Sequence, residues 1–372
     1  MIGAAAALVV ASAMFTLIED PIRRGKYLAM SPGRSALMGI ASILVVVAAS
    51  AGFAKISPSG DTEAGTRNRL ITEAAKDLAR VYRDNCHLAV EATTQPSCEY
   101  GVPGGWPRVV LFGDSHAAQW FPALDAAAIA EGWSLRSWTK SSCPASDIRI
   151  WYPPRRSAFH ECDTWREAVM TELTGPNRPE AVVISNLLDY SGWIESPNVP
   201  GKLLRKAEAE PLMREGFERT VRRLVEAGVI VIVIRDTPRM LRSFARCYVG
   251  GGNSGCDLIR ERALPKPWID VEVARSFPST SGVVLLDLTD QICDRNLCTV
   301  VRNGEIIWQD SHHIRAKYAI QQSEHFRLIP QRDRQNKTQV ICSIALHFDR
   351  HPECIEAGFE FPIGECRGRG KG

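Results

Sequence analysis

Two short polar motifs far apart in the chain contain the residue types needed for serine-based acyl chemistry. Residues 108–116 (RVVLFGDSH) form an apolar run that ends in a Gly-Asp-Ser turn containing Ser115. Residues 308–314 (WQDSHHI) place Asp310 three positions before His313. A hydroxyl nucleophile, an imidazole base and an orienting carboxylate form the triad that takes up and releases acyl groups. The sequence therefore predicts Ser115 as nucleophile, His313 as base and Asp310 as its orienting group.

The turn that carries Ser115 is predicted to join a strand to a helix. Gly113 tolerates backbone angles that other residues avoid, so the chain can turn sharply there. Ser115 would then lie at the start of the next helix, where main-chain N–H groups point outward and can stabilise an oxyanion. The alternative is that Asp114 and Ser115 only cap the helix. Asp310 and His313 follow a predicted last strand, and open α/β sheets bind ligands at such strand ends, which favours the catalytic interpretation.

Short apolar strands alternate with amphipathic helices through the middle of the chain. The predicted strands are 109–112, 134–138, 181–185, 229–235 and 283–288. The predicted helices are 117–131, 160–173, 205–227 and 314–325. Valine, isoleucine and leucine runs separated by helices indicate a parallel sheet buried on both faces. The fold class expected is α/β, as a three-layer α/β/α domain.

The motifs resemble those of the SGNH hydrolase and acyltransferase superfamily. The Gly-Asp-Ser turn at Ser115 matches its first block, and Asp310-x-x-His313 matches its last. More specifically, residues 80–325 resemble the SGNH domain fused to membrane acyltransferase family 3 proteins, which O-acylate cell-surface polysaccharides. Further similar segments are residues 113–119 (GDSHAAQ), 140–144 (KSSCP), 235–239 (RDTPR) and, at the end of the acyltransferase bundle, 18–24 (IEDPIRR).

The resemblance also implies an oxyanion hole built from three places. The main-chain N–H of Ser115 is one donor, and Ser142 and Asn186 stand where the family supplies the others, after the second and third strands. The family's glycine is missing at Ser142, but a main-chain donor needs no particular side chain. Asn186 could equally be a turn residue that hydrogen-bonds its own backbone.

Several neighbours of the motifs have alternative roles. His312 competes with His313 as base, and the Asp-x-x-His spacing selects His313. Asp114 is expected to support the turn, and His116 to lie beside the pocket. Six tryptophans could stack on a sugar, although core packing is the favoured role for each: Trp106, Trp120, Trp138, Trp151, Trp165 and Trp193. No metal site and no cofactor are predicted.

Two uncharged segments near the N-terminus are predicted to cross a membrane. Residues 35–54 contain 20 uncharged residues, the length that spans a bilayer, and residues 2–18 form a weaker span. A signal peptide is the alternative for residues 2–18, but no basic segment precedes them. Arg23, Arg24 and Lys26 lie between the spans and are assigned to the cytoplasm by the positive-inside rule. The domain that follows should therefore be extracytoplasmic.

Eleven cysteines are many for a chain of 372 residues. Eight fall into couples that are close in sequence, which suits disulfides in an oxidising compartment. Zinc binding is the alternative, but paired C-x-x-C motifs are missing. The expected couples are Cys86 with Cys98, Cys143 with Cys162, Cys247 with Cys256 and Cys293 with Cys298.

Four regions are expected along the chain. Residues 1–54 would be two transmembrane helices, implied by the resemblance to be a remnant of the acyltransferase bundle and a connecting helix. Residues 55–80 would be a linker and helix, 81–325 the catalytic SGNH domain and 326–372 an atypical tail. A net charge of +3 is too small to indicate nucleic acid binding.

The leading functional hypothesis is a membrane-anchored acyltransferase that acts outside the cytoplasm. The resemblance implies acetyl as the transferred group, a cell-envelope polysaccharide such as lipopolysaccharide as acceptor, and a membrane acyltransferase bundle that relays the acyl donor. The first alternative is an esterase that removes acyl groups, because the same triad can use water. The second is a non-catalytic glycan-binding module or truncated fragment.

Overall fold

The computed structural model describes residues 63–327 except 191, 197, 200, 241–255, 265 and 267, and also 340–343, 353–356 and scattered positions between 12 and 48. The chain divides into two compact units, Met1–Thr66 and Arg67–Gly372. Within the described residues, no helix is both long enough and apolar enough to span a bilayer. Most of the two predicted membrane spans lies outside the described residues.

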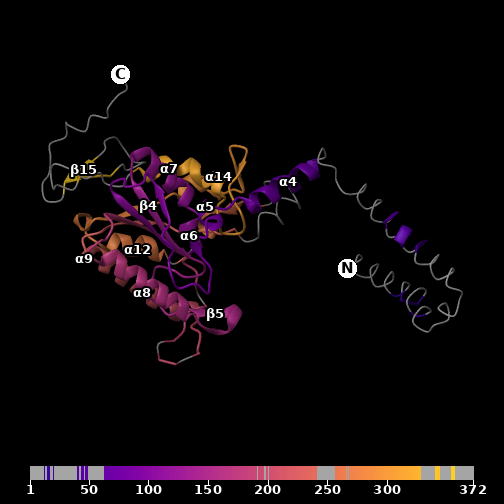
Figure 1. Cartoon of the computed structure of the whole chain (residues 1–372), viewed down its shortest axis with the longest axis horizontal. Helices are drawn as coiled ribbons and strands as arrows, with labels where there is room; N and C mark the ends of the chain where they lie inside the picture. Colours follow the sequence, from indigo (N-terminus) through magenta and orange to yellow (C-terminus); the bar gives the residue numbers. More distant parts are fainter. Residues whose placement is uncertain are drawn as a thin grey trace, which may run out of the picture. The chain divides into compact units, whose positions relative to one another are not determined.

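The unit Arg67–Gly372 is built on a seven-stranded sheet whose main path runs β1–β4–β3–β7–β8–β10 (Figure 1). All pairs along this path are parallel, and β2 adds antiparallel to β4. In the register, Gly113 is level with Thr139 of β4 and Ser185 of β7, so three strands end at the same edge. The strands are β1 His87–Leu88, β2 Glu99–Gly101, β3 Arg108–Gly113, β4 Ser134–Lys140, β7 Ala181–Ser185, β8 Ile230–Ile234 and β10 Val283–Leu286.

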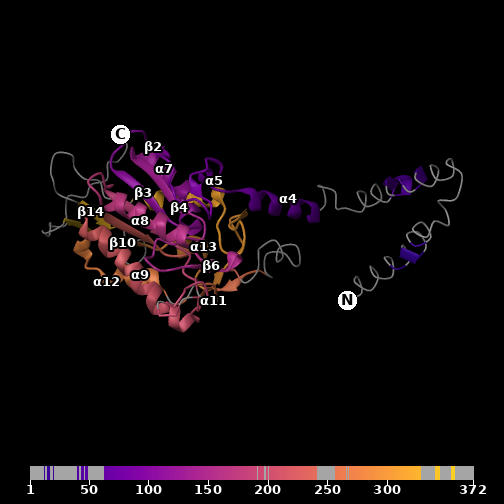
Figure 2. The ribbon, with the colours of Figure 1, turned by 60° about the horizontal axis from the view of Figure 1, so that its bottom comes forward.

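Helices cover both faces of the sheet (Figures 1 and 2). Alternate side chains of β3 point into two hydrophobic cores, one on each face of the sheet. Val109 and Leu111 belong to the core with α7 and α14, and Val110 and Phe112 belong to the core with α8 and α9. A strand buried on both faces is what the continuous apolar runs predict. The three-layer α/β/α fold is therefore confirmed. The helices are α4 Glu63–Lys76, α5 Arg80–Arg83, α6 Ser115–Ala118, α7 Phe121–Glu131, α8 His160–Thr174, α9 Lys206–Glu226, α11 Arg260–Ala263, α12 Ile269–Ser276, α13 Thr289–Ile292 and α14 Ala316–Ala319.

Two predicted helices are broken in the structure. The helix expected at 117–131 is α6 and α7, separated at Gln119 and Trp120, because Pro122 in the first turn of α7 has no N–H to continue the preceding helix. The helix expected at 314–325 is the short α14 followed by the 3-10 helix η5 (Ile320–Phe326). The break after α6 places Gln119 against the second motif, as described below.

The strands expected at 229–235 and 283–288 are shorter in the structure. The main-chain N–H of Asp236 donates to Asp270 Oδ2 (2.6 Å) rather than to the sheet. Asp287 Oδ1 accepts from the N–H of Thr289 (2.9 Å) at the start of α13. Both strands end where a carboxylate takes over a main-chain donor, which is a common competition at strand and helix ends.

Three of the four expected disulfides are present, joining Cys86 to Cys98, Cys143 to Cys162, and Cys293 to Cys298. Cys256 is buried, and Cys247, its expected partner, lies outside the described residues. Four short antiparallel strand pairs are also present among the described residues: β5 Trp151–Tyr152 with β6 Ser157–Ala158, β9 Leu258–Ile259 with β11 Leu297–Cys298, β12 Val301–Arg302 with β13 Glu305–Ile306, and β14 Val340–Ser343 with β15 Glu353–Glu356. Two 3-10 helices are η2 Pro153–Arg155 and η4 Ser279–Ser281.

Candidate active site

Ser115 lies at the N-terminus of α6, directly after the turn that ends β3. Gly113 has a φ of +148°, and a β-carbon there would collide with the carbonyl oxygen of Ser185. The turn therefore requires glycine. Asp114 is buried, and its Oδ1 accepts from the N–H of His116 (2.8 Å) while Oδ2 accepts from the hydroxyl of Tyr190 (2.8 Å). Asp114 thus holds the turn in place.

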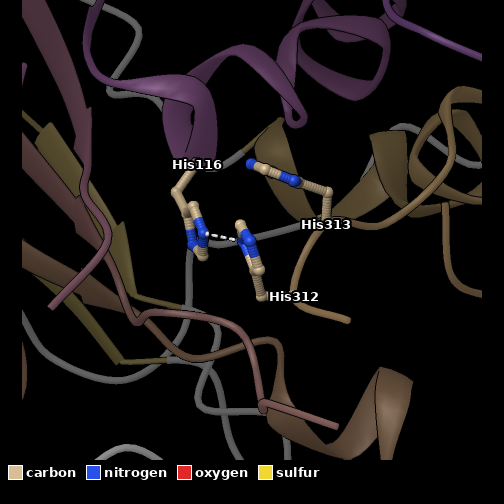
Figure 3. A group of neighbouring side chains, drawn as sticks. All are labelled: His116, His312 and His313. Carbon is tan, nitrogen blue, oxygen red and sulfur yellow. Dashed lines mark hydrogen bonds between the residues drawn. The ribbon is translucent and has the colours of Figure 1, made fainter. Parts of the chain in front are cut away.

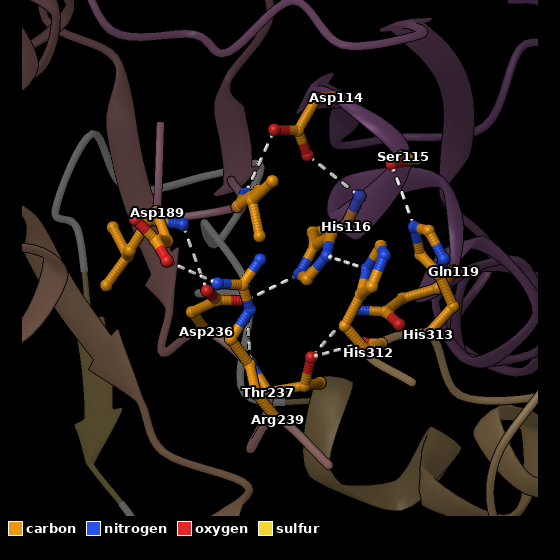
Figure 4. Close-up of polar contacts among 12 residues, drawn as sticks. Asp114, Ser115, His116, Gln119, Asp189, Asp236, Thr237, Arg239, His312 and His313 are labelled. Atoms are coloured by element: carbon orange, nitrogen blue, oxygen red, sulfur yellow. Dashed lines mark hydrogen bonds and ion pairs between the residues drawn. The ribbon is translucent and has the colours of Figure 1, made fainter. Parts of the chain in front are cut away.

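Ser115, His313 and Asp310 form one continuous hydrogen-bonded chain, whose link between Ser115 and His313 is drawn in Figure 4. Ser115 Oγ lies 2.9 Å from His313 Nε2, and His313 Nδ1 lies 2.7 Å from Asp310 Oδ2. Asp310 Oδ1 accepts the main-chain N–H groups of His312 and His313, each at 2.8 Å. Burial alone would raise the pKa of Asp310, but the hydrogen bond and positive charge of His313 hold it well below the usual range. Asp310 is therefore a carboxylate near neutral pH.

An ionised Asp310 determines which nitrogen of His313 carries the proton. A carboxylate only accepts, so His313 donates from Nδ1 and its Nε2 carries the lone pair that faces Ser115 Oγ. In this tautomer His313 can take the serine proton as a general base. The arrangement can therefore perform nucleophilic acyl chemistry.

Two side chains from other parts of the chain hydrogen-bond the main chain of the loop that carries Asp310 and His313. Gln119 Oε1 accepts from the N–H of Ile314 (2.8 Å), and Thr237 Oγ1 donates to the carbonyl of His312 (3.0 Å). Trp308, which is fully buried, bridges to Ile314. The break between α6 and α7 and the loop after β8 thus both position the second motif.

The two other predicted oxyanion donors lie on the loops after β4 and β7, the neighbours of β3. Ser142 has a positive φ of 58° and precedes Cys143, which is bonded to Cys162 of α8. Asn186 Oδ1 accepts the N–H of Ala145 (2.7 Å), so its side chain joins the two loops instead of bonding its own backbone. This contact uses the amide oxygen and leaves the amide NH₂ as the donating end of Asn186.

Sequence reasoning missed a second carboxylate–imidazole pair next to the first. His116 Nδ1 lies 2.5 Å from Asp236 Oδ1, and His116 Nε2 lies 2.9 Å from His312 Nδ1. His116 and Asp236 are both buried. Burial, with positive charge on His313, lowers the pKa of His116 to about 3 and that of His312 to about 4, and burial raises that of Asp236 to about 7. Residues 235–239 (RDTPR) are similar to a family segment, but no local pattern pairs Asp236 with a histidine 120 positions away.

The ring nitrogens of three histidines come within 4.8 Å of one another, although the sequence predicts no metal site (Figure 3). His116, His312 and His313 are also ligand types that suit zinc. In this structure His116 uses both of its nitrogens in hydrogen bonds, and so does His313. Coordination by all three would replace the bond between His313 and Ser115, so we assign no step to a metal.

A second buried histidine, His87, is in β1, at the end of the sheet next to β4. His87 bonds Thr139 Oγ1 and Ser141 Oγ, each at 3.0 Å, and its ring contacts Tyr82 with centroids 4.4 Å apart. Burial, with charge on His313 and Lys140, lowers the pKa of His87 to about 3. Of the tryptophans considered for sugar stacking, Trp120 and Trp165 are fully buried in the cores.

Curated proteins give no match. Among solved structures, the periplasmic domain of the lipopolysaccharide acetyltransferase of Salmonella ser. Paratyphi A aligns with a TM-score of 0.44 and 16% identity, covering 59% of this chain and 82% of that chain. The family model for the SGNH domain that is fused to AT3 domains matches residues 85–327, which include both motifs and every strand of the main sheet. The chain belongs to this family of SGNH domains.

Proposed function

We propose that this protein is an extracytoplasmic O-acyltransferase that moves an acyl group, acetyl in the simplest case, to a hydroxyl of a cell-envelope polysaccharide. The observation that carries the proposal is the hydrogen-bonded chain from Ser115 through His313 to Asp310 at the carboxyl edge of the sheet. Such a chain activates a serine for acyl transfer. A family in which the SGNH domain is fused to AT3 domains supports the transferase direction.

In the first half-reaction, Ser115 Oγ attacks the carbonyl carbon of the acyl donor and its proton passes to His313 Nε2. Asp310 stabilises the imidazolium, and the oxyanion accepts hydrogen bonds from the N–H groups of Ser115 and Ser142 and from the amide of Asn186. The tetrahedral intermediate collapses, the bond to the leaving group breaks, and His313 returns the proton to that group. Ser115 is left as an acyl ester.

In the second half-reaction, His313 takes the proton of an acceptor hydroxyl as its oxygen attacks the ester carbonyl. The bond to Ser115 Oγ breaks, and the proton returns from His313 to Ser115. The acyl group leaves on the acceptor and the enzyme is restored. We place the donor on a membrane acyltransferase bundle, since the family's AT3 fusion partner supports such a source.

An extracytoplasmic, membrane-associated position is part of the proposal. Three disulfides are typical of an oxidising compartment, and the basic residues between the two uncharged segments favour the same orientation. A reporter that is active only outside the cytoplasm, fused after Lys55, should be active. A fusion that is stably expressed but inactive would show the opposite orientation.

An esterase is the second candidate. The Asp310 side chain is 40% exposed and that of His313 is 16% exposed, so water can approach the triad. Water would then take the place of the acceptor hydroxyl in the second half-reaction, and the acyl group would leave as a free acid.

The two candidates separate in one experiment on the full chain. p-Nitrophenyl acetate should give a burst of one p-nitrophenol per chain as Ser115 is acetylated, and a serine-directed phosphonate should abolish it. Added polysaccharide should then become acetylated. Release of free acetate alone, at a rate unaffected by polysaccharide, selects the esterase, and the absence of both burst and phosphonate labelling refutes the nucleophile.

A further inference from the structure

The proposed half-reactions leave a buried chain of polar groups beside Ser115 without a role. Asp236, His116 and His312 are joined by hydrogen bonds of 2.5 and 2.9 Å (Figure 4). Asp236 and His116 are buried, whereas His312 is partly exposed in the site. Buried polar groups cost free energy unless they are hydrogen-bonded. The bonds between Asp236 and His116 therefore determine which ring nitrogen of His312, at the surface of the site, carries its proton.

Hydrogen bonds determine the proton positions along this chain. Burial raises the pKa of Asp236 to about 7, while Oδ2 accepts the N–H of Leu188 (3.0 Å) and Oδ1 accepts the N–H of Thr237 (2.8 Å), so the carboxylate form predominates above pH 7. A carboxylate requires His116 to carry its proton on Nδ1, so His116 Nε2 accepts. His312 must then donate from Nδ1, and its lone pair lies on Nε2. No described residue hydrogen-bonds His312 Nε2.

His312 is next to the reacting groups. Its ring centroid lies 4.1 Å from that of His313, whose Nε2 faces Ser115. Thr237 Oγ1 bonds the carbonyl of His312, and Asp310 accepts its N–H, so both the main chain and the ring are fixed. The rings of His313 and His312 therefore present two neighbouring hydrogen-bond acceptors, Nε2 of His313 for the reacting hydroxyl and Nε2 of His312.

We infer that His312 Nε2 accepts a hydrogen bond from a second hydroxyl of the acceptor, adjacent to the one that is acylated, so that the site selects vicinal diols. Sugars present hydroxyls on adjacent carbons, whereas water and simple alcohols offer one oxygen. His312 forms and breaks no covalent bond, and the proton of the reacting hydroxyl still goes to His313. This inference rests on the proposed acyl-Ser115 intermediate and names its acceptor class.

The test measures how a preformed acyl-enzyme divides its acyl group. Above pH 7, where Asp236 is a carboxylate, the full chain is acetylated with p-nitrophenyl acetate and offered cyclohexanol or cis-cyclohexane-1,2-diol, which differ by one hydroxyl. Wild type should acetylate the diol about tenfold faster per hydroxyl, the effect expected of one hydrogen bond in a partly buried site. His312→Ala should lose this preference, and His312→Gln, whose amide oxygen can accept, should recover part of it.

His160→Ala is the matched control, because His160 is an exposed histidine at the start of α8 and should keep the wild-type ratio. The ratio is measured on the same acyl-enzyme, so a slower acetylation of Ser115 does not affect it. An unchanged ratio in His312→Ala overturns the inference, as does a wild type that acetylates both compounds equally or neither. A wild type without a p-nitrophenol burst refutes the proposed function itself.

Discussion

The site contains two carboxylate–imidazole pairs. In each, a carboxylate oxygen contacts Nδ1 of a histidine, but the two pairs differ in their surroundings. Asp310 and His313 are three residues apart, and the Asp310 side chain is 40% exposed. Asp236 and His116 are 120 residues apart, and both side chains are at most 1% exposed. The first pair leads to a serine hydroxyl, and the second leads to another imidazole. The group that hydrogen-bonds the other ring nitrogen of each histidine, rather than the carboxylate–imidazole pair itself, determines what each pair can do.

The largest expected effect follows from removing the nucleophile Ser115 or the histidine of the first pair, His313. Ser115→Ala and His313→Ala should each lower kcat for acetyl transfer by about 10⁶, the loss seen when a triad nucleophile or base is deleted. His312→Ala should lose far less, because its ring does not bond Ser115. Burst kinetics with p-nitrophenyl acetate measure this. Wild-type turnover in Ser115→Ala would refute Ser115 as the nucleophile.

Matched amide substitutions compare the two pairs directly. Asp310→Asn should lower the rate of Ser115 acetylation about 10⁴-fold, since the amide favours the wrong tautomer of His313. Asp236→Asn should lower it about tenfold or less, while reducing the preference for the diol acceptor, because His116 stands between Asp236 and the site. Circular dichroism of both variants checks folding. Equal losses in the two folded variants would show that the second pair also serves acylation.

The difference between the pairs explains what the sequence could reveal. Asp310 and His313 are close in the chain, and their spacing is a local pattern. The alternation of strands and helices also predicts that β3 and the loop after the last strand meet at one edge of the sheet. Asp236 is brought to His116 only by the order β3–β7–β8 in the sheet, which no local pattern specifies.

Local competition explains the errors at the element ends. Pro122 gives α7 a start of its own, and the periodic apolar pattern across 117–131 hid this break. Carboxylates of Asp270 and Asp287 take main-chain donors at the ends of β8 and β10. Hydrogen bonds of this kind depend on side chains that are distant in sequence or two residues away, and hydrophobic periodicity does not detect them.

The Cys143–Cys162 disulfide lies beside Ser142, one of the proposed oxyanion donors. It closes a loop of 19 residues and ties the segment after Ser142 to α8. Replacing both cysteines with alanine should lower the free energy of unfolding by about 3 kcal/mol, measured by urea denaturation. Acetylation of Ser115 should also slow, because Ser142 is less restrained. Free thiols at both positions in the native protein, detected by non-reducing peptide mapping, would contradict the bond.

The smallest effect concerns His87, the buried histidine of β1 that hydrogen-bonds Thr139 and Ser141. Its pKa is lowered to about 3 by burial, against about 6.5 in an unfolded chain. Between these values the unfolded chain binds a proton that the folded protein does not, so stability falls as the pH drops from 6.5 towards 3. His87 should contribute about 1.4 kcal/mol per pH unit to this slope.

His87→Gln keeps polar groups near Thr139 and Ser141 but does not titrate, so its unfolding free energy should depend less steeply on pH between 6 and 4. Urea denaturation at four pH values measures the slope. His160→Ala, which removes an exposed histidine, is the control and should leave the slope at its wild-type value. Parallel wild-type and His87→Gln curves would mean that His87 takes up a proton within the folded protein. The comparison between the two pairs would then change, because a positively charged His87 near His313 would oppose the positive charge that His313 gains when Ser115 attacks the acyl donor.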